Sequence, residues 1–197
     1  GWNDVDALFK ELNKQGVRER LHQNALTLIW VNWAIKVGEL AKVTNFFSEY
    51  ESKINDLEGA GRGWLKTEWR LTEARLCFVE GAYSKVDRVL RSVNGAELDR
   101  HQQKTFDLIT AETAILQNNP EKAISIISSK KWTKVIDSRN RESLDWAVYR
   151  GWIEGVALHK LNEYEKSHKT LSEAYGISEV VFGKTHPHSS KIALAIL

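Results

Sequence analysis

The stretch that decides the fold is residues 151–176, GWIEGVALHKLNEYEKSHKTLSEAYG. Its apolar and small residues recur at spacings of three and four, the period of a helix, on both sides of a short polar turn. They are Trp152, Gly155 and Leu158 before the turn, and Ser167, Leu171 and Ala174 after it. A residue as small as Gly155 lets a second helix approach closely, and small residues on that second helix let the next pair dock. The stretch therefore predicts a pair of antiparallel helices that stacks on similar pairs.

The same pattern can be laid on three earlier segments. The residues that take the place of Gly155 are Val31, Ala74 and Ala111, and the second helices that follow carry Val43 and Phe47, Val86 and Leu90, and Ala123 and Ile127. In the third segment Asn119 can cap the second helix, with Pro120 at its first position, where a missing N–H costs nothing. The four places lie 43, 37 and 44 residues apart, which predicts longer helices or loops than in a 34-residue repeat.

These motifs resemble the tetratricopeptide repeats, whose signature is Trp-x2-Leu-Gly-x2-Tyr on the first helix and Ala-x3-Phe on the second. The matching residues here are Gly155, Leu158, Tyr164, Ser167, Leu171 and Ala174. Further on, Phe182-Gly183-Lys184-Thr185-His186-Pro187 resembles the Leu-Gly-x-x-His-Pro element of the longer repeats of kinesin light chains, which also occur in bacterial signalling proteins. In this element Gly183 can end one helix in a left-handed cap, and Pro187 can begin the next.

The resemblance implies an all-α fold, a superhelix of antiparallel helix pairs (an α-solenoid), as a single domain over residues 1–197. We expect about nine or ten helices: an N-terminal capping helix at 3–16, repeats at approximately 20–55, 64–94, 104–130 and 144–182, and the start of a truncated further repeat at 187–197. The sequence has no methionine and ends on the apolar pair Ile196-Leu197, whereas a solenoid normally ends in a polar capping helix. We therefore expect the chain to belong to a longer protein.

The composition argues against several classes of partner. The 28 basic and 26 acidic residues are interspersed, and the short basic run within 130–141 is typical of a solvated loop, so no direct nucleic-acid binding is expected. No stretch approaches the ~20 apolar residues of a membrane span, and the first residues do not resemble a signal peptide. Because Cys77 is the single cysteine, it can form neither a disulfide within the chain nor a cysteine-based zinc site. A cytoplasmic location is expected.

No pattern typical of catalytic, cofactor-binding or metal-binding residues is found, so we do not expect an enzyme. Cys77 lies on the inward face of a predicted helix, where burial would raise the pKa of its thiol and block access. The glycines within 59–63 lack the preceding strand and the following Gly-Lys-Ser/Thr of a phosphate-binding loop. His186 and His188 have no third metal ligand close in sequence. The eight tryptophans are explained by core packing, since several recur at helical spacing.

In the tetratricopeptide repeats the first helix of each pair lines a concave wall, so the resemblance implies that its unburied side chains contact a ligand. The candidate contacts are Asn32, Lys36, Arg75, Phe78, Glu112, Trp152, His159 and Lys160. Such a mixture of polar, charged and aromatic groups suits peptide recognition. We therefore expect a scaffold that binds a protein or peptide in its groove, within a larger signalling or regulatory protein.

Two alternatives stay open. The first is a sensor, the ligand-binding domain of a transcription regulator or a kinase, whose curvature changes when a peptide or small molecule binds. An enclosed pocket with convergent polar groups would favour the sensor, and an open channel would favour the scaffold. The second alternative is self-association, in which the unfinished C-terminal helix packs against another copy to form a homo-oligomer.

Overall fold

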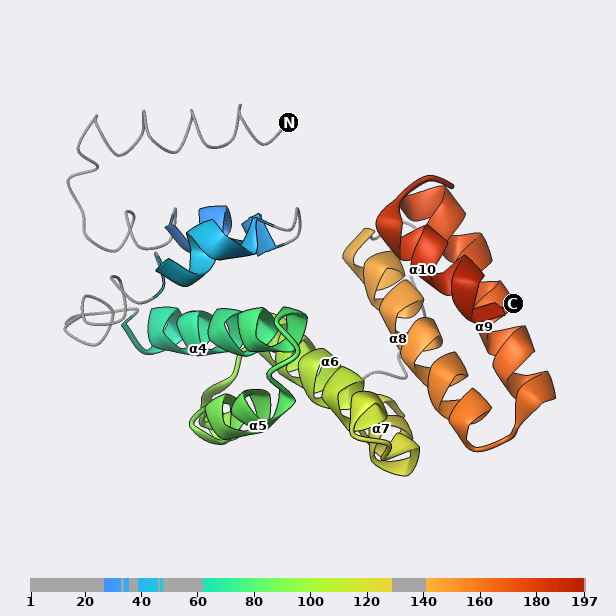
Figure 1. The fold of residues 1–197 in the computed structure, drawn as a ribbon, viewed down its shortest axis with the longest axis horizontal. Coiled ribbons are helices and arrows are strands. Elements are labelled where there is room, and N and C mark those ends of the chain that lie inside the picture. The colour runs from blue at the N-terminus through green and yellow to red at the C-terminus, as the bar shows by residue number, and fades with distance from the viewer. Residues whose placement is uncertain are drawn as a thin grey trace. The chain divides into compact units, whose positions relative to one another are not determined.

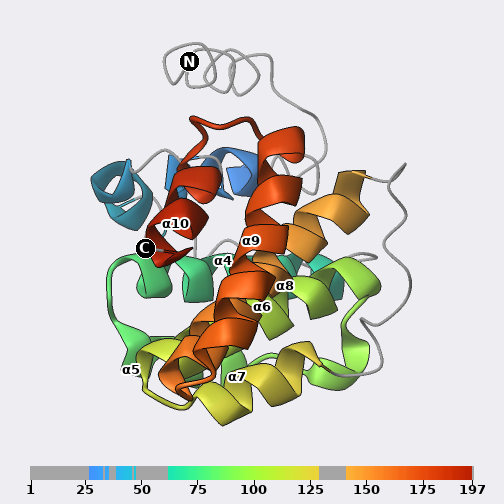
Figure 2. The same cartoon turned by 90° about the vertical axis from the view of Figure 1, so that its right-hand side faces the viewer.

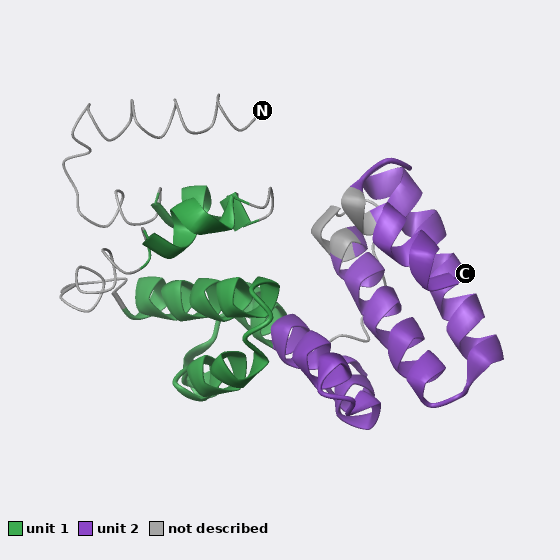
Figure 3. Ribbon diagram, in the orientation of Figure 1, with its two compact units in different colours: residues 1–106 green, residues 107–197 purple. Residues whose placement is uncertain are grey.

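The computed structural model describes residues 27–32, 34–35, 39–45, 47, 62–128 and 141–196. All regular structure in these residues is helical and no strand occurs among them, which confirms the predicted all-α class (Figure 1). The chain divides into two compact units, Gly1–Phe106 and Asp107–Leu197 (Figure 3). The predicted capping helix at 3–16 lies outside the described residues.

Unit 1 contains helical residues within 27–35 and 40–47, then α4 (Arg62–Val79), α5 (Tyr83–Arg91), a short 3-10 helix η1 (Gly95–Glu97) and the beginning of α6 (Arg100–Leu116). Its core joins the early helical residues to α4. The ring of Phe47 stacks on that of Trp69 with 4.1 Å between centroids, and Leu65 and Leu76 of α4 are buried in the same apolar cluster. Phe47 belongs to the helical residues before α4 and Trp69 to α4 itself, so this core joins two successive helix pairs.

Unit 2 contains the rest of α6, then α7 (Pro120–Ile127), α8 (Arg141–Lys160), α9 (Tyr164–Val181) and α10 (Pro187–Ile196). The helices α8 and α9 are antiparallel neighbours, and α10 lies beside α9 (Figure 1, Figure 2). Two apolar clusters fill the unit, one joining α6, α7 and α8 around Ile153 and the other joining α8, α9 and α10 around Leu171. Across the two units, α4, α6 and α8 begin two to four residues before the repeat ranges predicted from the sequence.

Three tight turns of the same geometry join α4 to α5, α6 to α7 and α8 to α9. The middle residue of each turn has a positive φ, +76° at Gly81, +59° at Asn118 and +62° at Asn162. Its N–H donates to the carbonyl three residues earlier at 3.0–3.1 Å, and the next N–H donates to the carbonyl five residues earlier at 2.8–3.0 Å. This is the Schellman motif, which glycine adopts freely and asparagine tolerates. The next helix begins two residues later in every case, so the chain builds the same hairpin turn three times.

Three places are buried in each of four successive helix pairs. The first place is the small or β-branched residue of the first helix, and the others follow it by 12 and 16 residues on the second helix. The four sets are Val31, Val43 and Phe47; Ala74, Val86 and Leu90; Ala111, Ala123 and Ile127; and Gly155, Ser167 and Leu171. Apart from the buried Gly155, each of these residues is at most 8% exposed. The packing between paired helices is therefore repeated at constant sequence positions.

The α8–α9 pair shows why the first place needs a small residue. A Cβ atom added to Gly155 would lie 2.4 Å from Cγ of Leu171 and 2.7 Å from its Cδ2, well inside van der Waals contact. The hydroxyl of Ser167 also donates to the carbonyl of Gly155 at 2.8 Å. The two helices thus touch backbone to side chain, as the sequence predicts from the glycine.

Two helix boundaries confirm predictions made from local sequence. The side chain of Asn119 accepts a hydrogen bond from the N–H of Lys122 at 3.2 Å, and Pro120 is the first residue of α7. After α9, Gly183 has a φ of +90° and its N–H donates to the carbonyl of Glu179 at 3.1 Å. Pro187 then begins α10.

Candidate functional site

The predicted ligand contacts lie on the first helices, close to the buried small places. The residues directly after those places are Asn32, Arg75, Glu112 and Val156, and all four are half-buried. This face of each first helix is therefore neither core nor fully solvated. Its side chains are held by neighbours, and each unit holds them differently.

In unit 1 the structure brings Asn32 and Arg75 together. Nη1 of Arg75 donates to Oδ1 of Asn32 at 3.1 Å. Nδ2 of Asn32 donates to Oγ1 of Thr72 at 3.2 Å and to the carbonyl of Leu28 at 3.0 Å. The amide of Asn32 thus bridges its own helix and α4, and it fixes the Arg75 guanidinium at the surface.

The other two predicted contacts of unit 1 are Phe78, which the structure describes, and Lys36, which it does not. The ring of Phe78 meets that of Tyr83 edge to face, with 5.8 Å between centroids. This contact spans the α4–α5 turn. It explains why Phe78 is half-buried, so no bound peptide is needed to account for its position. Lys36 lies outside the described residues.

In unit 2 three side chains from three helices form what we call the Lys191 cluster: Glu112 of α6, Trp152 of α8 and Lys191 of α10. Nζ of Lys191 lies 3.5 Å from the centroid of the Trp152 ring and 3.4 Å from Oε1 of Glu112. A cation–π contact at an exposed site contributes about 0.5–1 kcal/mol, and a surface ion pair about 0–1 kcal/mol. The cluster therefore links α10 to α6 and α8 only weakly.

Lys191 is absent from the predicted contacts, although Glu112 and Trp152 are among them. The repeat pattern is incomplete in the last helix, and Lys191 stands 39 residues after Trp152 and 79 after Glu112. No local spacing connects residues so far apart. Continuing the wall positions into α10 is the one sequence signal that could have found it.

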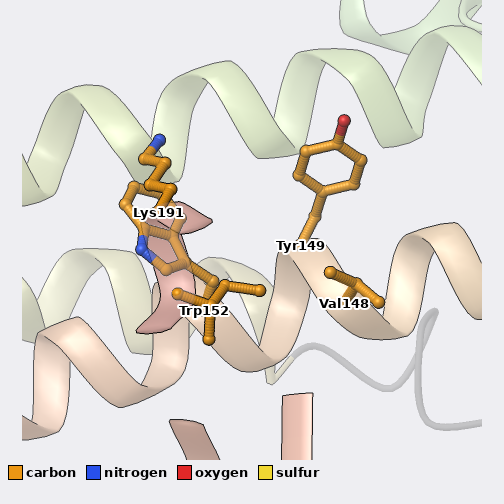
Figure 4. Close-up of a pocket in the computed structure, with 5 residues that line it drawn as sticks. Val148, Tyr149, Trp152 and Lys191 are labelled. Atoms are coloured by element: carbon orange, nitrogen blue, oxygen red, sulfur yellow. The ribbon is translucent and has the colours of Figure 1, made fainter. Parts of the chain in front are cut away.

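A small cavity lies beside the Lys191 cluster, between α8 and α10. It is lined by Val148, Tyr149, Trp152, Lys191 and Ile192 and has a volume of ≈ 10 Å³, about the room of one water molecule. The side chain of Lys191 runs across the ring of Trp152, and the amine of Lys191 and the hydroxyl of Tyr149 point to the same side of α8 (Figure 4). A cavity of this size does not hold a small-molecule ligand.

His159 and Lys160, the last two predicted contacts, lie at the end of α8 and are exposed. Nζ of Lys160 is 3.4 Å from Oδ1 of Asn118, which links the α8–α9 turn to the α6–α7 turn. The ring of His159 meets that of Tyr164 edge to face at 5.2 Å. Leu116, at the same place on α6 as Lys160 on α8, is 49% exposed. This end of unit 2 thus offers an apolar group and a cation to solvent.

A polar cluster between α4 and the start of α6 belongs to the framework of unit 1. Asp99 and Gln102 form a capping box, with the N–H of Gln102 donating to Oδ1 of Asp99 at 2.8 Å and the N–H of Asp99 donating to Oε1 of Gln102 at 3.3 Å. Nε1 of Trp64 donates to Oδ2 of Asp99 at 2.8 Å. The N–H of Gln102 is the main cause that lowers the pKa of Asp99. Burial raises the pKa of Glu68 against a hydrogen bond from Gln102 and the nearby His101.

The thiol of Cys77 is buried, as predicted. Burial, assisted by the carboxylates of Glu73 and Glu80, raises its pKa. A thiol with a raised pKa is protonated at neutral pH and is a poor nucleophile. Within the part of the chain that the structure describes, no three His, Cys, Asp or Glu side chains gather as metal ligands would.

None of the protein-family models, the curated proteins and the solved structures compared with this chain matches it. The resemblance to tetratricopeptide repeats therefore depends on the motifs and the repeated hairpins alone. Among the helices described, none combines the length and the apolar character that crossing a membrane requires.

Proposed function

We propose that the chain is a protein- or peptide-binding scaffold of the tetratricopeptide type, part of a larger signalling or regulatory protein, and that the first helices of each unit form a binding wall. One observation carries the proposal. The same three places are buried in four successive helix pairs, and three of the pairs have the same turn. Each first helix therefore keeps one half-buried face that its own second helix does not cover.

The side chains on that face support recognition of a polypeptide. In unit 2 they include the indole of Trp152, the Lys191 and Glu112 charges, and the exposed Leu116 and Lys160. Interfaces favour such a mixture, in which an aromatic group supplies contact area and charged groups supply orientation. Pre-formed helices also lose little conformational entropy on binding.

The sensor alternative gains no support from the cavity beside Trp152. Its volume of ≈ 10 Å³ is far below the several hundred Å³ (about 300–1,000) that a small-molecule site needs. An interaction with an extended or helical peptide needs no enclosed pocket. A second hollow, of ≈ 310 Å³ and lined by residues 162–166 at the α8–α9 turn, is wide open to solvent rather than enclosed. The scaffold is therefore the function that the described geometry supports best.

The test is photo-crosslinking with the full 197-residue chain in a lysate of the cells that produce it. A benzophenone amino acid replaces Leu116 on the wall in one variant and Val180 on α9, which is 83% exposed, in another. We expect a partner to be crosslinked at 116 and not at 180. Lys160→Glu should reduce the yield, whereas Lys169→Glu, a matched charge reversal on exposed α9, should leave it unchanged. Equal capture at both sites, or none at 116, would refute the wall as the binding surface.

A further inference from the structure

The Lys191 cluster places a cation of the chain itself over an aromatic ring on the proposed wall. Nζ of Lys191 sits 3.5 Å from the Trp152 centroid and 3.4 Å from Oε1 of Glu112. The side chain of Lys191 is 47% exposed, but that of Glu112 is only 18% exposed. The groups that hold the ammonium are thus more buried than the ammonium they hold.

We infer that Trp152 and Glu112 form a receptor for the ammonium group of a partner's lysine side chain, and that Lys191 occupies this receptor while no partner is bound. The inference rests on the proposed function and names one chemical requirement of the partner. The partner segment carries a lysine that enters between α6 and α8 as Lys191 leaves.

The chemistry of the receptor selects an ammonium group. An indole face attracts a cation through its quadrupole, and a half-buried carboxylate beside it adds charge complementarity. The structure gives Lys191 one carboxylate oxygen contact, which suits a compact point charge, whereas a guanidinium is best recognised by two parallel hydrogen bonds. The cavity beside Trp152 has room for about one water, which is too little for a lysine side chain, so the ligand group approaches from the solvent.

Lys191 can leave without opening the core of unit 2. The packing of α10 depends on the next residue, Ile192, which is 2% exposed and belongs to the apolar cluster with Leu171 and Ala174. The lysine side chain makes its contacts on the surface instead. Its departure would expose the Trp152 face beside the Glu112 carboxylate, which is the state that a partner's lysine would fill.

Because Lys191 occupies the receptor, it also lowers the apparent affinity of the receptor for other ammonium groups. The apparent affinity of a ligand falls by the fraction of time for which its site is free. Lys191 therefore weakens the binding of any isolated ammonium, which must be in excess to displace it, and a lysine carried by a segment that makes further wall contacts competes better. The cluster acts as an internal competitor built into the binding wall.

The experiment follows the indole N–H signal of Trp152 by NMR, assigned with Trp152→Phe, during titration with Nα-acetyl-lysine methylamide. We expect saturable shifts with an affinity at least about 5-fold tighter for Lys191→Ala than for wild type, because the internal competitor is gone. The Nε-acetylated form of the probe should not bind. Adding Glu112→Gln to Lys191→Ala should weaken binding again, and Lys169→Ala should behave as wild type. Equal affinity in wild type and Lys191→Ala, or an effect that survives Glu112→Gln, would overturn the inference.

A second measurement uses the wild-type chain and so does not depend on the folding of a variant. The ε-CH2 group of Lys191 is bonded to Nζ, which lies 3.5 Å from the Trp152 ring centroid, so its protons should be shifted upfield by the ring current. Excess probe should move them toward their free position, and no movement at saturating probe would also overturn the inference. If a partner is crosslinked at position 116 but the probe does not bind, only the lysine receptor is refuted. If the probe binds but no partner is crosslinked, the proposed scaffold function is refuted instead.

Discussion

At the scale of single residues, the contact between Gly155 and Leu171 sets how closely α8 and α9 pack. Gly155→Ala should destabilise the chain, because the new Cβ would lie 2.4 Å from Cγ of Leu171, which is itself 1% exposed and packed in an apolar cluster with Val148 and Ile192. Overpacking costs about 1–3 kcal/mol and alanine recovers roughly 1 kcal/mol of helix propensity, so a net loss of up to about 2 kcal/mol in the free energy of unfolding is expected. Chemical denaturation followed by circular dichroism measures it.

The control for Gly155 is Gly176 of α9, where an added Cβ meets nothing within 4 Å. The same substitution there should raise stability by about 0.5–1 kcal/mol, since it lowers the entropy of the unfolded chain and improves helix propensity. If Gly155→Ala and Gly176→Ala were both more stable than wild type, α8 and α9 would not pack as closely as described.

Glu68 predicts a pH dependence of stability. Burial raises its pKa above the ordinary value of 4.5, so between the unfolded and the folded pKa the folded chain binds more protons than the unfolded chain. Stability from this group is present below pH 4.5 and is lost as the pH rises through the folded pKa. Glu68→Gln should therefore raise the unfolding midpoint at pH 7, and the gain should vanish below pH 4.5.

The charged groups near Glu68 also shift its pKa. His101 and Arg75 lower its pKa and Asp99 raises it, all less than burial does. Asp99 itself works in the opposite sense, because its lowered pKa contributes stability that is lost on acidification. Denaturant titrations of wild type and Glu68→Gln at several pH values separate the two groups. A variant less stable than wild type at pH 7 would show that the Glu68 carboxylate is stabilising.

At the scale of helices and turns, the positive φ of Asn162 makes the α8–α9 turn selective. Asn162→Val should cost about 1–2 kcal/mol, since a β-branched residue is disfavoured in the left-handed region. Asn162→Gly should stay within about 0.5 kcal/mol of wild type, because relief of strain is offset by the entropy of the unfolded glycine. Thermal unfolding of the two variants decides the point, and equal losses would mean that the side chain, which accepts a hydrogen bond from the Tyr164 hydroxyl, matters more than the backbone.

The features that could be predicted from the sequence are those with local causes. Asn119 and Pro120 imply a capped helix start and Gly183 implies a helix end, because these effects act within a few residues. Gly155 implies a close helix pair, because its contact lies on the next helix after a short turn. The hydrogen bond that Arg75 donates to Asn32 could not be predicted. The pattern places them at equivalent positions, but whether two such side chains bond to each other depends on the distance between helices, which spacing along the chain does not contain.

The Lys191 cluster could not be predicted for the same reason: its contacts depend on the distances between helices, and its residues lie even farther apart in the sequence. Its cation is 79 residues from its carboxylate, and neither residue belongs to a motif.

The helices α4, α6 and α8 begin before the predicted repeat ranges for a different reason. Helix ends depend on packing and capping partners as well as on periodicity, so the first apolar residue of a pattern marks where the buried face begins, not where the helix begins.

At the scale of the whole molecule, α6 runs through the boundary of the two compact units. The helix spans Arg100–Leu116, and the boundary falls between Phe106 and Asp107. Helix formation is cooperative, so half of a helix is rarely stable when its other half unfolds. The units should therefore share part of their unfolding, as neighbouring repeats do in a linear array.

The single thiol reports on this coupling. Cys77 lies in unit 1 and is buried, so a disulfide reagent should label it only when α4 and its neighbours open. Gly155→Ala changes unit 2 alone, yet coupled unfolding would carry its loss of up to about 2 kcal/mol to Cys77 and raise the labelling rate by up to about 30-fold. Gly176→Ala, the stabilising control, should lower the rate. Units that unfold independently would leave the rate unchanged in both variants, and α6 would then break at the boundary without affecting the helices on either side.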